Sequence, residues 1–123
     1  MAGTIAADTL THSTAGSLGT QFVVNGSAKS WIKYNGTGTI AISDSFNVAS
    51  ILDEATGTTT ITFISAMSNA NYSIKGQNSD GALHIQVVDT NQTTAAYRQR
   101  TLDGGGSLVD DDAVYGDTHG DLA

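Results

Sequence analysis

The sequence contains no cysteine, few cationic residues and no long hydrophobic run. The absence of cysteine excludes disulfides, thiolate metal sites, iron–sulfur clusters and a cysteine nucleophile. No apolar run approaches the ~20 residues that span a bilayer, so we expect no membrane insertion. No basic region followed by an apolar stretch opens the chain, so no secretory signal is expected. Burial, hydrogen bonding or oligomerisation must therefore hold the chain together.

Positive charge is scarce as well. The formal net charge is −7, and the only cations are Lys29, Lys33, Lys75, Arg98 and Arg100. A surface that follows nucleic-acid phosphates needs more of them, so we expect no nucleic-acid partner. Charged residues make up 14% of the 123 residues, against about 25% in an ordinary soluble domain. This composition is typical of a structural or recognition protein, and we expect neither catalysis nor a cofactor.

Period-two alternation of apolar and polar residues, bounded by Gly, Asn and Asp, runs through most of the chain and indicates strands and turns. Helix-forming residues are rare, and Glu54 is the only glutamate. The strands recur every ~8–12 residues, which is typical of an antiparallel sandwich or barrel. We predict strands near 22–24, 28–34, 39–43, 46–52, 58–64, 72–74, 82–88, 93–100 and 113–122.

The predicted fold is all-β: an antiparallel β-sandwich or jelly-roll-like domain over residues 21–123, with an extended N-terminal arm over residues 1–20. Residues 11–20 contain a single large apolar side chain, Leu18, and cannot bury much by themselves. Two interpretations of the arm stay open: it is ordered on a partner or another copy of the chain, or it is a disordered leader. Pairing of exposed strand edges between copies would cover them and favours oligomerisation.

Several motifs follow one another in a characteristic order. They are A-K-S-W-I-K-Y-N-G-T-G-T-I at 28–40, D-S-F-N-V at 44–48, T-F at 62–63 and N-A-N-Y at 69–72. This order resembles a β-domain family found in bacteriophage tail-fibre and virion surface proteins, often of aquatic phages. The resemblance covers residues 28–75, and the rest more loosely. It implies a commonly trimeric protein on the outside of the virion, with a tail adaptor or the major capsid protein as partner, and no catalytic residues.

Aromatic side chains are the first candidates for recognition. Trp31, Tyr34 and Tyr97 belong to this set, together with Tyr72 and Tyr115, since sugar-binding surfaces often use exposed aromatics near Asn, Asp and Thr. Trp31 and Tyr34 have apolar neighbours in their strand, which favours packing in the core or between subunits. Tyr97 lies among Thr, Gln and Arg, which favours exposure. The partner that such a surface would contact is a host surface glycan.

Charged residues supply the remaining candidates. Arg98 and Arg100 lie on one face of a strand, and we expect them to pair with the 110–112 region of a neighbouring copy. Exposed pairs of this kind contribute about 0–1 kcal/mol, so they would set register more than affinity. Asp103 belongs to a loop over 103–107 which, with the loops at 76–81 and 91–94, is predicted to form a variable tip.

Two further groups contain residue types that can ligate a metal ion. The carboxylates of Asp110, Asp111 and Asp112 could contact a hard cation, but their spacing matches no calcium loop, so a solvated acidic loop is favoured. The three histidines are isolated in the sequence. An ordinary surface or interface role is favoured over an ion site on a trimer axis. No metal site is therefore predicted; the histidines are His12, His84 and His119.

Three functions are consistent with these observations. The favoured one is a non-enzymatic virion protein, a trimeric short tail fibre or fibre tip that takes part in host adsorption. The alternative is a capsid decoration, or cement, protein that clips shell subunits together. The third is a glycan depolymerase, which is disfavoured because neither a large β-helical body nor a convergent carboxylate pair is evident.

Overall fold

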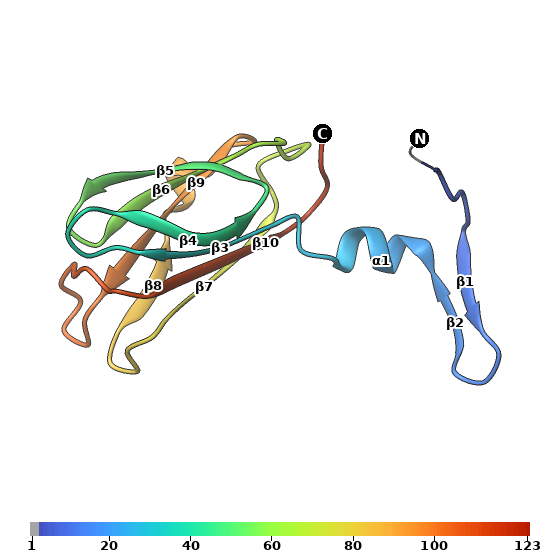
Figure 1. Cartoon of the computed structure of the whole chain (residues 1–123), viewed down its shortest axis with the longest axis horizontal. Helices are drawn as coiled ribbons and strands as arrows, with labels where there is room; N and C mark the ends of the chain where they lie inside the picture. Colours follow the sequence, from blue (N-terminus) through green and yellow to red (C-terminus); the bar gives the residue numbers. More distant parts are fainter. Residues whose placement is uncertain (1–2) are drawn as a thin grey trace.

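A computed structural model describes residues 3–123, which form a β-sandwich and a projecting N-terminal segment (Figure 1). The sandwich has two four-stranded sheets in which all neighbouring strands are antiparallel. The predicted all-β antiparallel sandwich is confirmed. The first sheet has the order β4-β3-β10-β7, with β3 Ser30–Asn35, β4 Ala41–Phe46, β7 Ser73–Asn78 and β10 Val114–His119. The second has the order β5-β6-β9-β8, with β5 Val48–Ala55, β6 Thr58–Phe63, β8 His84–Val87 and β9 Ala96–Leu102.

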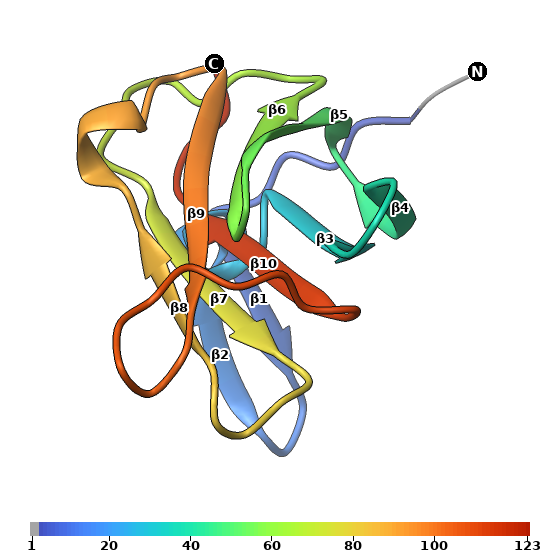
Figure 2. The same ribbon diagram turned by 90° about the vertical axis from the view of Figure 1, so that its left-hand side faces the viewer.

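Burial follows the predicted alternation along the strands. Buried and less buried residues alternate strictly through β3, β9 and β10, because successive side chains of a strand point to opposite faces. In Figure 2 the strands of the two sheets run at an angle to one another, with β9 drawn in front of β10. The core between the sheets consists of Ile32, Tyr34, Val48, Ile61, Phe63, Met67, Tyr72, Tyr97 and Val114.

The chain passes from the first sheet to the second at Asn47. The prediction of one strand over 46–52 is wrong, because β4 ends at Phe46 and β5 begins at Val48. Asn47 has a φ of 55°, in the left-handed region that asparagine tolerates better than most residues. Its amide Nδ2 donates to the carbonyls of Lys29 (2.9 Å) and Ser65 (3.1 Å), and its Oδ1 accepts from the Ser65 amide (2.7 Å). The side chain thus fixes the corner between the sheets.

The N-terminal segment is a hairpin and a helix rather than a single extended arm. Strands β1 Thr9–His12 and β2 Gly16–Gly19 pair with each other only, and α1 Thr20–Gly26 follows directly. The predicted strand at 22–24 is wrong. No sheet edge lies beside it in Figure 1, and a helical turn satisfies its own backbone amides where a strand would leave them unpaired. Of the predicted arm, residues 1–2 lie outside the described part of the chain.

The helix joins the sandwich through one lysine. Lys29 is buried, and its ammonium donates to the Val24 carbonyl and, at 3.0 Å, to the Ser27 carbonyl. Within residues 3–123 no helix has the length and apolar character to cross a membrane.

Strand β7 also extends beyond its prediction. Residues 76–78, expected to lie in a polar loop, continue β7, since β10 supplies a pairing partner for each of them. Gly76 faces Gly116 of β10 in this register. A Cβ on Gly76 would collide with the side chain of Ile85, so glycine lets β7 approach β8 of the other sheet.

Candidate recognition surface

The aromatic candidates separate into buried and exposed residues. Tyr34 is 2% exposed and belongs to the core, as expected for a packing residue. Trp31 points the other way from β3 and is 40% exposed, so the core interpretation is wrong for it, while packing between subunits stays a prediction. Period-two alternation separates the two residues, because they lie three positions apart and so point to opposite faces.

The prediction that Tyr97 is exposed is wrong. Tyr97 faces inward from β9, opposite Ile61 of β6, and none of its side chain is exposed. Its inward neighbours in β9, Gln99 and Thr101, are polar and buried too. Gln99 Nε2 donates to the hydroxyl of Tyr34 at 3.0 Å, so a polar contact joins the sheets inside the core. The polarity of β9 therefore did not reveal which of its faces was inside.

The two arginines lie on the second sheet and have different surroundings. Arg98 Nη2 contacts Glu54 Oε1 at 2.8 Å, and its Nε donates to Thr60 Oγ1 at 3.2 Å. Hydrogen bonds from Thr60 and then from Arg98 hold the pKa of Glu54 below its usual value. Arg98 thus has a carboxylate partner within its own chain. For Arg100, the Nε is buried and has no hydrogen-bond partner among residues 3–123. Pairing of either arginine with 110–112 of another copy stays a prediction.

The acidic segment is less solvated than predicted. Asp111 is 6% exposed, and its carboxylate accepts from Ser79 Oγ (3.1 Å) and from the Ala113 amide (3.3 Å). Burial alone would raise the pKa of Asp111, but hydrogen bonds from Ala113 and Ser79 outweigh it and keep that pKa below its usual value. Asp110 accepts from the Gly57 amide at 2.6 Å. These carboxylates hold loops together, and within the described chain no three metal-ligating side chains gather.

Asp103 organises its own loop. Its Oδ1 accepts from the amides of Gly105 (2.9 Å) and Ser107 (2.8 Å), and its amide donates to the Ser107 carbonyl (2.9 Å). A carboxylate that accepts from amides two and four residues ahead shapes a turn. The loop remains exposed, so its predicted role in a tip is still open, but the Asp103 carboxylate is engaged inside the turn.

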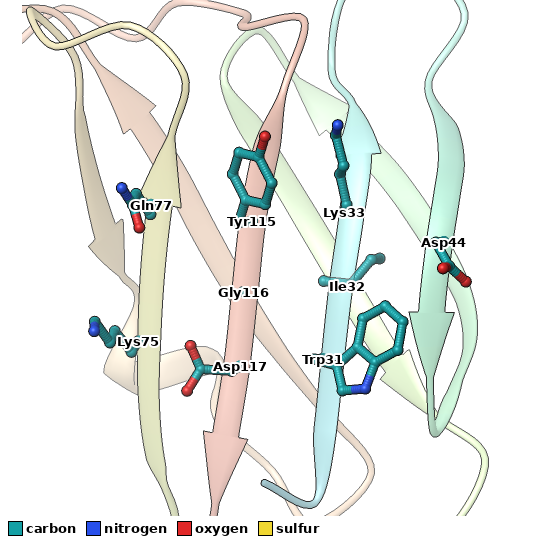
Figure 3. A pocket seen from close by; sticks show the side chains of 9 residues that line it. All are labelled: Trp31, Ile32, Lys33, Asp44, Lys75, Gln77, Tyr115, Gly116 and Asp117. Carbon is teal, nitrogen blue, oxygen red and sulfur yellow. The ribbon is translucent and has the colours of Figure 1, made fainter.

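A different set of side chains gathers on the outer face of the first sheet. The strand register places them in two rows across the four strands. One row consists of Asp44, Lys33, Tyr115 and Gln77, and the next of Phe46, Trp31, Asp117 and Lys75. We call these eight residues the β3–β10 face. Figure 3 shows seven of them, with the rings of Trp31 and Tyr115 displayed on neighbouring strands.

The β3–β10 face contains a shallow depression of about 400 Å³. Ile32 and Gly116 lie between the outward-pointing side chains and line it, although the side chain of Ile32 points into the core. The outward side chains form its walls. The floor is therefore strand backbone, and the aromatic rings and charged groups stand around it (Figure 3).

Charge on the β3–β10 face is balanced and largely unpaired. It carries Lys33 and Lys75 together with Asp44 and Asp117, and none of these forms an ion pair with another within the described residues. The ammonium of Lys33 lies 5.5 Å from the centroid of the Tyr115 ring, within cation–π range. Asp117 Oδ2 lies 3.3 Å from Nδ1 of His119. Both signs of charge and the exposed ring of Trp31 thus lie on one surface, together with the Tyr115 ring that Lys33 approaches.

The predicted site residues do not form one site. Of the six, only Trp31 belongs to the β3–β10 face, and Tyr115 from the wider aromatic set joins it. The alternation of Trp31 and Lys33 against Ile32 was the available sequence signal for this face. The pairing of β10 with β3 and β7 had no such signal, because β10 follows β3 by about 80 residues and β7 by about 40, and the sequence gives no register over such separations. No protein-family profile, curated protein or solved structure matches the chain.

Proposed function

We propose that the chain is a non-enzymatic structural protein of a bacteriophage virion: a short tail fibre or fibre tip that assembles as a homotrimer and takes part in host adsorption. The observation that carries this proposal is the N-terminal segment. The segment projects from the sandwich (Figure 1), and its large apolar side chains are exposed to solvent in the single chain. They are Ile5, Leu10, Leu18, Phe22, Val23 and Val24.

The composition of this segment is that of an assembly interface. Asp8 is its only charged residue between 3 and 26, and the cores of stable interfaces are depleted of charge. An apolar groove of about 540 Å³ runs between the chain near Ile5 and the helix residues Val23 and Val24. Exposed apolar surface of this kind favours association, and identical chains associate most often with closed symmetry. The same segment of two further copies is the occupant that the trimer requires.

The virion assignment rests on the resemblance of residues 28–75 to phage surface domains. The chain has a folded sandwich at one end and an exposed apolar segment at the other, an arrangement that would allow a larger assembly to display the sandwich on its surface. The segment would anchor the trimer, while the outer sheet faces stay free for contact with a host. This arrangement also suits the capsid decoration alternative, in which the segment grips neighbouring shell subunits.

Light scattering on the full chain tests assembly. The expected mass is three times the 12.6 kDa of the chain. The variant Phe22→Ser/Val24→Ser should shift it to a monomer. Leu52→Ser is the matched control, since Leu52 is an equally exposed apolar residue on β5 of the sandwich, and it should leave the trimer intact. A monomeric full chain at micromolar concentration would refute the trimer.

Immunogold labelling of intact particles tests the location. Antibody raised against the purified chain should place gold at the tail. Gold spread over the head would replace the fibre assignment with capsid decoration, and particles without gold would contradict both virion roles.

A further inference from the structure

We propose that the β3–β10 face binds a neutral glycan, with a sugar ring stacked on Trp31 or Tyr115 and its hydroxyls hydrogen-bonded by the charged residues around them. This inference deepens the adsorption role proposed above and rests on it for its biological setting, but the binding itself is a property of one sheet face.

The rings supply the stacking surface. Trp31 and Tyr115 lie diagonally on the neighbouring strands β3 and β10, since Trp31 faces Asp117 and Tyr115 faces Lys33. Both stand on the rim of the same depression (Figure 3). The face of an aromatic ring is electron-rich, and the C–H groups on one side of a sugar ring are weakly positive, so the two attract while apolar area is buried. Rigid strands hold both rings in place, which lowers the entropic cost of binding.

The charged groups supply partners for hydroxyls. A sugar hydroxyl both donates and accepts, and the face offers donors in Lys33 and Lys75, acceptors in Asp44 and Asp117, and both in Gln77. Hydrogen bonds to charged groups are about twice as strong as those between neutral groups. No ion pair joins these ammonium and carboxylate groups to one another, so only the contact of Asp117 with His119 competes with a ligand for a carboxylate.

Charge also decides between classes of glycan. The two lysines and two aspartates cancel, so the face attracts neither anions nor cations. The chain as a whole carries a net charge of −7, which repels a polyanionic glycan at long range. A neutral glycan needs no attraction by net charge and is not repelled by the negative charge of the chain.

A second copy of the chain is the competing occupant, since Trp31 and Phe46 are both exposed beside each other in the register. The two lysines and two aspartates of the β3–β10 face argue against it, because the buried cores of interfaces between subunits are depleted of charge. The N-terminal segment, with its single charged residue, is the better interface between copies.

The sequence provides its own reporter for the test, because Trp31 is the only tryptophan. Its fluorescence is followed while the full chain is titrated with neutral oligosaccharides of glucose, mannose, galactose and N-acetylglucosamine. Oligogalacturonate serves as the acidic probe. We expect a saturable change with at least one neutral probe, with a dissociation constant on the order of 0.1–10 mM for a single shallow site.

Substitutions on the face locate the binding. Tyr115→Ala should weaken it at least tenfold, whereas Tyr115→Phe, which keeps the ring, should retain it within about threefold. Asp117→Asn should weaken it several-fold. Thr60→Ala, on the outer face of the second sheet, is the control and should change nothing. Circular dichroism checks that each variant keeps its fold.

Three results would overturn the inference: no response to any neutral probe, a response to oligogalacturonate alone, or an emission that shifts on dilution of the chain and is unaffected by sugar, which would identify a second copy as the occupant. The trimer proposal can be contradicted independently of the glycan-binding proposal. Phe22→Ser/Val24→Ser should still bind sugar even where it is monomeric, so a monomeric wild-type chain that binds would contradict only the trimer.

Discussion

The hydroxyl of Tyr97 lies directly against Gly116 of the opposite sheet: a Cβ placed on Gly116 would stand 2.5 Å from that oxygen. The same hydroxyl is buried and has no hydrogen-bond partner among residues 3–123. Burial raises the pKa of the Tyr97 hydroxyl far above its usual range. The inner face of Gly116 thus receives a tyrosine from β9, directly behind the depression of the β3–β10 face.

The contact predicts that Gly116→Ala is destabilising. The added methyl would press on the Tyr97 oxygen and would lie 3.1 Å from Gln99 Oε1. Neither neighbour can move easily, because both are buried in the core. We expect a loss of about 1–3 kcal/mol in the free energy of unfolding, measured by urea denaturation. Gly81→Ala is the control, since a Cβ there would meet nothing within 4 Å.

Removing the hydroxyl should rescue that variant. Tyr97→Phe deletes a buried group without a partner, so by itself it should be neutral or stabilising by up to about 1 kcal/mol. In the double variant the methyl occupies the vacated space. We expect a favourable coupling of about 0.5–3 kcal/mol between the two sites. Strict additivity of the two single effects would show that this contact does not limit the packing.

The role of Asn47 at the corner between the sheets predicts how two substitutions there change the free energy of unfolding. Asn47→Gly keeps the left-handed backbone but loses the side-chain bonds to Lys29 and Ser65, so it should cost about 1–3 kcal/mol. Asn47→Ala loses the same bonds and adds strain at positive φ, so it should be about 1 kcal/mol less stable than the glycine variant. Denaturant unfolding measures both. Equal stabilities for the two variants would contradict the role of the backbone angle, and Asn25→Ala on the exposed helix is the control.

The lowered pKa of Asp111 predicts that its contribution to the stability of the fold depends on pH. Its pKa is lowered in the folded chain, so the ionised carboxylate contributes stability above the unfolded value of about 3.9 and loses it as the pH falls through the folded pKa. Asp111→Asn should therefore be less stable than the wild type by about 1–2 kcal/mol at pH 7. The difference should shrink as the pH falls from about 4 toward 2.

Unfolding by guanidinium across that pH range measures the Asp111 effect. Asp121→Asn is the control, because Asp121 is exposed and its side chain makes no hydrogen bond within the described chain. A difference between wild type and Asp111→Asn that stayed constant down to pH 2 would show that the charge of Asp111 does not carry its contribution.

The sequence predicted the strands better than it predicted their faces. Alternation in 28–34 correctly put Trp31 on the face opposite Ile32 and Tyr34, but it did not show which face was inside, and Trp31 was expected to pack like Tyr34. In β9 the rule failed: Gln99 and Thr101 are buried beside Tyr97, so a polar strand carries a polar inner face. The helix at 20–26 was missed for another reason. Three consecutive apolar residues suit a strand, but no sheet edge lies beside them in the described structure (Figure 1).

The sequence by itself determined the class of this protein. Period-two alternation and turn residues at regular intervals lead to an antiparallel β-sandwich, because these are local properties of the chain, while the lack of cysteine excludes disulfides as its support. Tertiary structure alone decided the candidate site. The pairing of β10 between β3 and β7 brings Tyr115 and Asp117 beside Trp31, and Lys75 beside Asp117. Register between strands this far apart depends on packing across the whole sandwich, which no local pattern encodes.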